Sequence, residues 1–194
     1  MLTRLRKLLK ARDGLAAVEF ALIAPVLGTM LLGTIELCNA LECHQKVTMV
    51  ASSASDLVAQ TTAVSATDMS DIFNAATAII YPFDQNNISI VVSSVLSDGA
   101  GNGTVSWSAA NANGKKLDVN TPIALSQALM VTCTASPAKC SPCAAGVCSV
   151  ILTQVRYNYT SPIGKYFVGS VPMTDYFFER PRKSAKVACN SCSG

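Results

Sequence analysis

The sequence has few charged residues and only one histidine. Charged side chains make up 14% of its 194 residues, whereas half of the residues are hydrophobic. No serine or cysteine nucleophile motif surrounds His44, so histidine-assisted nucleophilic catalysis has no candidate here. Asp98 and Asp118 lie in turn-like segments, where aspartate is common, and neither has calcium-loop spacing. We therefore expect a protein that is not an enzyme and that holds no cofactor and no metal.

Excess positive charge is confined to the N-terminus. Residues 1–14 hold five Lys or Arg and one Asp, a net charge of +4, whereas the remainder holds ten Lys or Arg and eleven Asp or Glu, a net charge of −1. Because this larger part lacks a basic excess, the sequence argues against nucleic-acid binding. A basic leader before an apolar run obeys the positive-inside rule, which predicts a cytoplasmic N-terminus and export of the rest of the chain.

One long helix is expected over residues 15–60. Residues 15–41 are apolar nearly all round, which is typical of a helix that faces lipid or is buried in a fibre, and they form the expected membrane-spanning part. A secretory signal would have a shorter apolar core and a cleavage site of small residues, and no such site clearly ends this run. Farther along, helical spacing predicts one apolar face, and serines lie on the other. The apolar face consists of Val47, Val50, Ala51, Ala54, Leu57 and Val58.

Residues 61–194 are expected to form a cysteine-rich extracytoplasmic domain. Ser65-Ala66-Thr67-Asp68 resembles a capping box that opens a second helix, and Tyr81-Pro82 ends it. Strands are expected at 87–96 and 104–108, which flank a glycine-rich turn as a hairpin, at 150–159 and at 186–189. The expected fold class is α+β: a long N-terminal helix, a second helix and a small antiparallel sheet stabilised by disulfides.

The eight cysteines are candidates for those disulfides: Cys38, Cys43, Cys133, Cys140, Cys143, Cys148, Cys189 and Cys192. Disulfides are the expected state outside the cytoplasm, but the sequence does not choose among the pairings. The two C-x-x-C pairs, 140/143 and 189/192, also suit a four-thiolate zinc site or a redox pair. Cys38 and Cys43 point in different directions on a helix and should not pair with each other. Either can bond elsewhere, and Cys38 can equally stay a free thiol.

The segment Gly14-Leu15-Ala16-Ala17-Val18-Glu19-Phe20 places a carboxylate inside an apolar run. A charge near one end of a membrane-length helix is expensive, so it usually has a task and a partner. Glycine before a cut lets a protease pocket accept the backbone without a side chain. Cleavage after Gly14 would give Leu15 a free amine, with which Glu19 of a neighbouring identical helix can pair. The alternative is that Glu19 lies at the membrane interface of an uncleaved anchor.

This segment resembles the type IV pilins, and more closely the TadE/TadG-like pseudopilins of tight-adherence pilus systems. The resemblance is close over residues 13–55 and weaker over 155–159 and 180–182. The residues that carry it, and to which it gives processing and assembly roles, are Gly14, Leu15, Glu19, Phe20 and Pro25. It implies a minor pilin or pseudopilin that takes part in pilus assembly, adhesion or secretion.

The resemblance also implies partners and a location. A prepilin peptidase would remove residues 1–14, and the mature chain would contact other pilins or pseudopilins and the inner-membrane assembly platform. The implied location is the bacterial inner membrane, with a single pass, a cytoplasmic N-terminus and a periplasmic domain, and then the pilus or cell surface after assembly. The alternative function is an uncleaved, single-pass, membrane-anchored periplasmic binding domain. A third is a thiol–disulfide enzyme that uses one of the C-x-x-C pairs.

Overall fold

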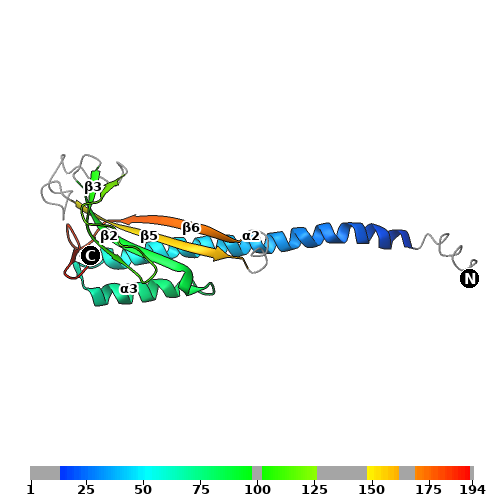
Figure 1. The fold of residues 1–194 in the computed structure, drawn as a ribbon, viewed down its shortest axis with the longest axis horizontal. Helices are drawn as coiled ribbons and strands as arrows, with labels where there is room; N and C mark the ends of the chain where they lie inside the picture. The colour runs from blue at the N-terminus through cyan, green and yellow to red at the C-terminus, as the bar shows by residue number, and fades with distance from the viewer. Residues whose placement is uncertain (1–13, 98–101, 126–147, 162–168, 193–194) are drawn as a thin grey trace, which may run out of the picture. The chain divides into compact units, whose positions relative to one another are not determined.

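The protein is α+β, as the sequence predicts (Figure 1). A computed structural model describes residues 14–97, 102–125, 148–161 and 169–192. Its elements are α2 (Leu15–Ala59), β1 (Ala63–Val64), α3 (Ala66–Ala78), the 3-10 turn η2 (Gln85–Asn87), β2 (Ile88–Ser97), β3 (Asn102–Ala110), β4 (Pro122–Ala124), β5 (Cys148–Thr160), β6 (Ser170–Glu179) and β7 (Ala188–Cys189). The chain divides into two compact units, residues 1–40 and 41–194, with the division inside α2.

The long helix α2 begins and ends within one residue of the predicted bounds and continues through Pro25. In the second unit one face of it is buried: Cys43, Val47, Val50, Ala51, Ala54, Val58 and Ala59. Two side chains on its flanks were predicted wrongly, since Leu57 is 40% exposed and Ser55 is fully buried. The buried arc is shifted toward Ser55 and Ala59.

The C-terminal tail accounts for this shift, because it crosses the end of α2. The Arg182 backbone N–H donates to the Ala59 carbonyl at 2.9 Å, and its guanidinium pairs with Asp56 at 2.5 Å and with Glu179 at 3.3 Å. The pairs are partly exposed, so each contributes at most about 1 kcal/mol. The tail therefore covers a side of α2 that helical periodicity alone assigns to solvent.

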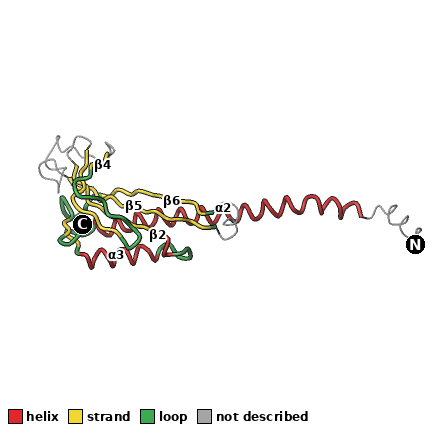
Figure 2. The backbone as a smooth tube through the Cα atoms, in the orientation of Figure 1, coloured by secondary structure: helices red, strands yellow, loops and turns green. Residues whose placement is uncertain are grey.

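Five strands form an antiparallel sheet in the order β4-β3-β2-β5-β6 (Figure 2). The predicted hairpin is confirmed as β2 and β3, and the strand predicted at 150–159 is β5. Strand β6 was not predicted, because Pro172 and Asp175 interrupt its apolar pattern. It is an edge strand, where proline is tolerated because one side of the backbone needs no ladder partner. The short strand predicted at 186–189 is present as β7, which pairs in parallel with β1.

Residues 41–59 of α2 cover one face of the sheet. Strand register places Val155 of β5 opposite Asp175 of β6, and Thr48 of α2 donates to the Asp175 carboxylate on that face. Tyr157, two residues farther along β5, is 3% exposed. Burial raises its pKa to about 12, and nearby Cys43 of α2 adds to the rise. The sheet's other face has its own apolar cluster, formed by Val95, Val105, Leu125 and Leu152 and covered by Leu117, Ile123 and Phe178.

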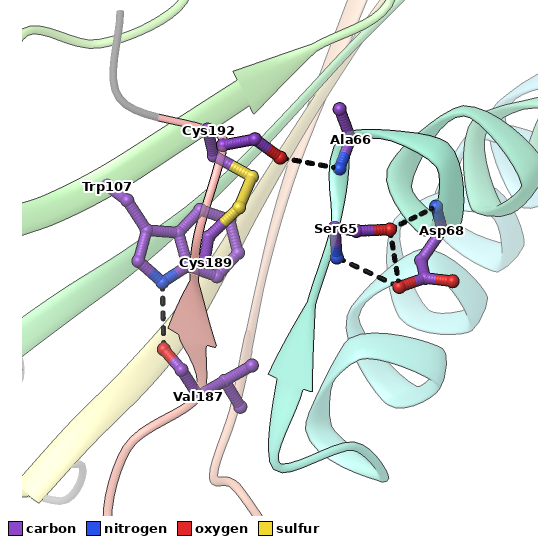
Figure 3. Close-up of a disulfide and its surroundings, with 8 residues drawn as sticks. Ser65, Ala66, Asp68, Trp107, Val187, Cys189 and Cys192 are labelled. Carbon is purple, nitrogen blue, oxygen red and sulfur yellow. Dashed lines mark hydrogen bonds between the residues drawn. A yellow bond between two sulfur atoms is a disulfide. The ribbon is translucent and has the colours of Figure 1, made fainter.

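A reciprocal capping box starts α3, as predicted (Figure 3). The Ser65 hydroxyl accepts from the Asp68 N–H at 3.2 Å, and the Asp68 carboxylate accepts from the Ser65 N–H at 2.8 Å. Together the two bonds satisfy backbone donors that the first turn leaves without helical partners. Met69, Phe73 and Ala76 then form the buried face of the helix.

A disulfide between Cys189 and Cys192 holds the tail beside this helix start (Figure 3). Between them, the Ser191 hydroxyl accepts from the Ala66 N–H in the first turn of α3 at 2.9 Å. The disulfide pairs two of the eight candidate cysteines and uses two of the four thiolates that a zinc site would need. The segment is thereby a structural staple that also completes the cap of α3.

Asp68→Asn removes the charge from the capping box, so its effect depends on pH. Hydrogen bonds from the backbone N–H and the hydroxyl of Ser65 lower the pKa of Asp68 below its ordinary 3.8. Because the folded pKa lies below the unfolded one, the carboxylate stabilises the fold above the unfolded pKa, and this stability is lost as pH falls through the folded pKa. We expect the wild type to melt above Asp68→Asn at about pH 6 and the two to converge toward about pH 2. Thermal circular dichroism of the full chain in detergent checks this, and a gap that does not change with pH contradicts it.

Candidate assembly interface

Between Val18 and Leu41, α2 exposes apolar side chains around its whole circumference. They include Val18, Phe20, Leu22, Ile23, Val26, Leu27, Met30, Leu31, Leu32, Ile35, Leu37 and Leu41, each at least 45% exposed. Among the described residues one helix, Ala16–Ala59, is long and apolar enough to cross a membrane, judged by length and composition alone. This suggests a membrane anchor.

The threonine hydroxyls within this apolar stretch have hydrogen-bond partners on the helix itself. Its two threonines, Thr29 and Thr34, donate their hydroxyls to the helix carbonyls of Val26 and Met30, each at 2.9 Å. Such internal bonds remove the cost of placing a hydroxyl in an apolar medium. Pro25 has no N–H and therefore leaves the Ala21 carbonyl without its usual helical donor. Its predicted role in assembly stays a prediction.

Glu19 is exposed, and its side chain forms no hydrogen bond or ion pair with another residue in the described part of the chain. Both Glu19 and Phe20 lie on the surface of α2, and Gly14 immediately precedes the first helical residue, Leu15. Leu15 and Glu19 are four residues apart, so they share one face and are separated by about 6 Å along the axis. A parallel neighbour shifted by about one turn would therefore bring its residue 15 level with Glu19.

Small residues form a stripe along this part of α2. Ala17, Ala21, Ala24 and Gly28 recur at steps of four and three, which places them on one helical face. A side chain added at Gly14, Gly28 or Gly33 meets nothing within 4 Å, so no contact inside the protomer requires these glycines. Small residues let a neighbouring helix approach closely, so this stripe and Gly33 beyond it are points where such a helix can pack.

The remaining cysteines are only partly placed. Cys38 is an exposed free thiol, and Cys43 is a buried free thiol, so within the described chain neither forms a disulfide with the C-terminal part. Cys148 begins β5. The other candidates in that region, Cys133, Cys140 and Cys143, lie outside the described residues, as does the leader over residues 1–13.

Comparison with known proteins concerns this same helix. Residues 14–56 match the model of a family described as TadE-like protein. Comparisons with curated proteins and with solved structures found no match. The matched segment begins at Gly14 and covers nearly all of α2, which confirms the resemblance seen in the sequence. Over residues 14–56 this chain is therefore similar to the TadE-like proteins, a family associated with pili.

Proposed function

We propose that this protein is a minor pilin or pseudopilin of a tight-adherence pilus and takes part in pilus assembly, adhesion or secretion. The observation that carries the proposal is the exposed apolar surface of α2 within the TadE-like segment. A helix that is apolar all round suits lipid before assembly and the apolar faces of neighbouring helices afterwards. The same helix thus serves both as membrane anchor and as assembly element.

The charge distribution supports a specific location and specific partners. A leader of net charge +4 holds the N-terminus at the cytoplasmic face of the inner membrane, and the unit at 41–194 folds on the periplasmic side. A prepilin peptidase cleaves after Gly14 on the cytoplasmic side. The assembly platform then brings the mature chain against other pilins, where Glu19 pairs with a neighbour's Leu15 amine and Phe20 and Pro25 lie in the contact.

The Cys189–Cys192 pair supports a structural role over a redox one. A redox pair needs an accessible sulfur for thiolate attack. Cys192 is 3% exposed, Cys189 is half-buried in β7, and the loop between the two cysteines is occupied in capping α3. These features favour a staple that keeps the tail in place.

N-terminal sequencing of the protein recovered from membranes and from sheared pili tests the proposal. We expect Leu15 as the first residue in the pilus fraction and both Met1 and Leu15 in the membrane fraction. Met1 as the sole N-terminus in all fractions contradicts the proposal and supports the uncleaved anchor instead.

A further inference from the structure

A polar cavity of about 280 Å³ lies on the sheet face turned away from α2. Its floor comes from β2 and β5, and its wall comes from the loop that follows β3. The lining residues are Ser89, Val91, Lys115, Lys116, Leu117, Asp118, Thr121, Gln154 and Arg156. All of them belong to the unit at 41–194, and none belongs to the assembly interface. The volume is at the lower end for ligand sites, so it suits a small molecule.

Positive charge dominates the cavity. The lining holds three cationic residues, Lys115, Lys116 and Arg156, and a single carboxylate, Asp118, which gives a net charge of +2. Neither lysine forms a salt bridge with a carboxylate in the described part of the chain. The chain beyond residue 14 has a net charge of −1, so this is a local concentration of cations. Such a concentration attracts an anion.

The arginine is held in place before any ligand arrives. When the Gln154 amide oxygen is turned toward the guanidinium, it accepts from Arg156 Nη2 at 2.7 Å and from Nε at 2.9 Å. The same oxygen accepts from the Tyr176 hydroxyl at 3.0 Å. A guanidinium has five N–H donors, so others stay available for a carboxylate or phosphate. Because the arginine side chain is already ordered, binding a ligand costs less of its conformational entropy.

The loop that carries the two lysines is also fixed to the sheet. Asn111 extends the pairing of β3, because its side-chain oxygen accepts from the Ile90 N–H at 3.0 Å and its own N–H donates to the Ile90 carbonyl at 3.0 Å. Farther along, the Leu117 N–H donates to the Ser108 hydroxyl at 3.0 Å. A Cβ at Gly114 would lie 2.9 Å from the Ile90 carbonyl oxygen, so the close approach of loop to strand requires glycine there.

We propose that this cavity binds a monosaccharide-sized anion: a carboxylate or phosphate that carries neighbouring hydroxyl groups. Lys115, Lys116 and Arg156 take the anionic group. The hydroxyl of Ser89 and the amide of Gln154 hydrogen-bond the ligand's hydroxyls, and the apolar side chains of Val91 and Leu117 contact its C–H face. The site is independent of the assembly interface and does not rest on the pilin function.

Titration calorimetry on the full chain in uncharged detergent tests the site with four probes: glucuronate, glucose 6-phosphate, inorganic phosphate and glucose. We expect one of the two sugar anions to bind with a Kd of about 1 mM or lower, and inorganic phosphate and glucose to bind at least about tenfold more weakly. Tighter binding of glucuronate assigns a carboxylate ligand, and tighter binding of glucose 6-phosphate assigns a phosphate. In K115Q/K116Q we expect a loss of about tenfold. The matched control K183Q/K186Q removes the same charge from two exposed lysines outside the cavity and should keep the affinity within about twofold.

Three outcomes overturn the proposal. One is the absence of heat with both sugar anions at about 10 mM. Another is an equal loss of affinity for the sugar anion in K115Q/K116Q and K183Q/K186Q. That result would mean that the net charge of the protein, and not the cavity, determines binding. In the last outcome, inorganic phosphate or glucose binds as tightly as the better sugar anion. The cavity would then not recognise the anionic group and the hydroxyl groups together. Circular dichroism is the check that each variant is folded, and loss of fold is not expected because all four lysines are exposed.

Discussion

Glu19→Gln is expected to reduce incorporation of this protein into pili by at least roughly a hundredfold, with cleavage and membrane insertion unchanged. Glutamine has nearly the same shape as glutamate, so the apolar contacts of α2 are kept. Only the charge is lost. The measurement is the amount of this protein in sheared pili relative to the amount in membranes, determined by immunoblotting.

The size of this effect follows from the environment that assembly creates. In the single chain Glu19 is exposed, and no contact with another described residue explains its presence. Surrounded by neighbouring apolar helices, the Leu15 amine would be a buried cation without a counter-charge once Glu19 is replaced. Removing one partner of a buried ion pair costs about 3–5 kcal/mol. Before assembly the amine remains at the membrane surface, so insertion does not carry this cost.

Glu42→Gln is the matched control. Glu42 is an exposed carboxylate on the same helix, and it lies in the unit at 41–194. Its replacement makes the same change in net charge, and we expect normal incorporation. If Glu19→Gln enters pili as well as Glu42→Gln does, the pairing of Glu19 with a neighbour's amine is wrong.

Local sequence signals predicted the elements that local chemistry determines. Helix α2 follows from an unbroken apolar run, α3 from the Ser65–Asp68 capping box, and the hairpin from two β-branched runs around glycines. Edge strand β6 and the burial of Ser55 could not be predicted in this way. Both depend on what packs beside them, namely β5 and the tail that follows Glu179.

The two candidate sites also differ in how far local sequence signals predict them. The assembly segment is contiguous in sequence, so the relation of Gly14 to Glu19 is visible from spacing alone. The anion cavity combines β2, β5 and the loop after β3, which are brought together only by strand order. Its lysines had no distinguishing neighbours in the sequence, and Arg156 was noticed only as part of a strand.

Gly14→Val is expected to abolish processing, so the protein accumulates as a precursor that retains residues 1–14. Glycine at the residue before the cut presents only backbone to the protease. The stiff, β-branched side chain of valine would clash with a pocket that accepts backbone alone. The precursor keeps five cationic side chains at its N-terminus. Burying these charges among apolar helices is too costly, so the variant should be absent from pili although it is present in the membrane. Intact-mass measurement of the membrane fraction detects the retained leader.

Gly28→Val separates this effect from a general defect in α2. Neither Gly14 nor Gly28 has an atom within 4 Å of an added Cβ, so both variants are expected to fold and insert. Gly28 lies fourteen residues beyond the cut, which makes normal processing the expected result there. Any loss of Gly28→Val from pili would then reflect close packing against a neighbouring helix. Removal of the leader from Gly14→Val at the wild-type rate would contradict the assignment of Gly14 to the processing site, and with it the origin of the amine that Glu19 is proposed to meet.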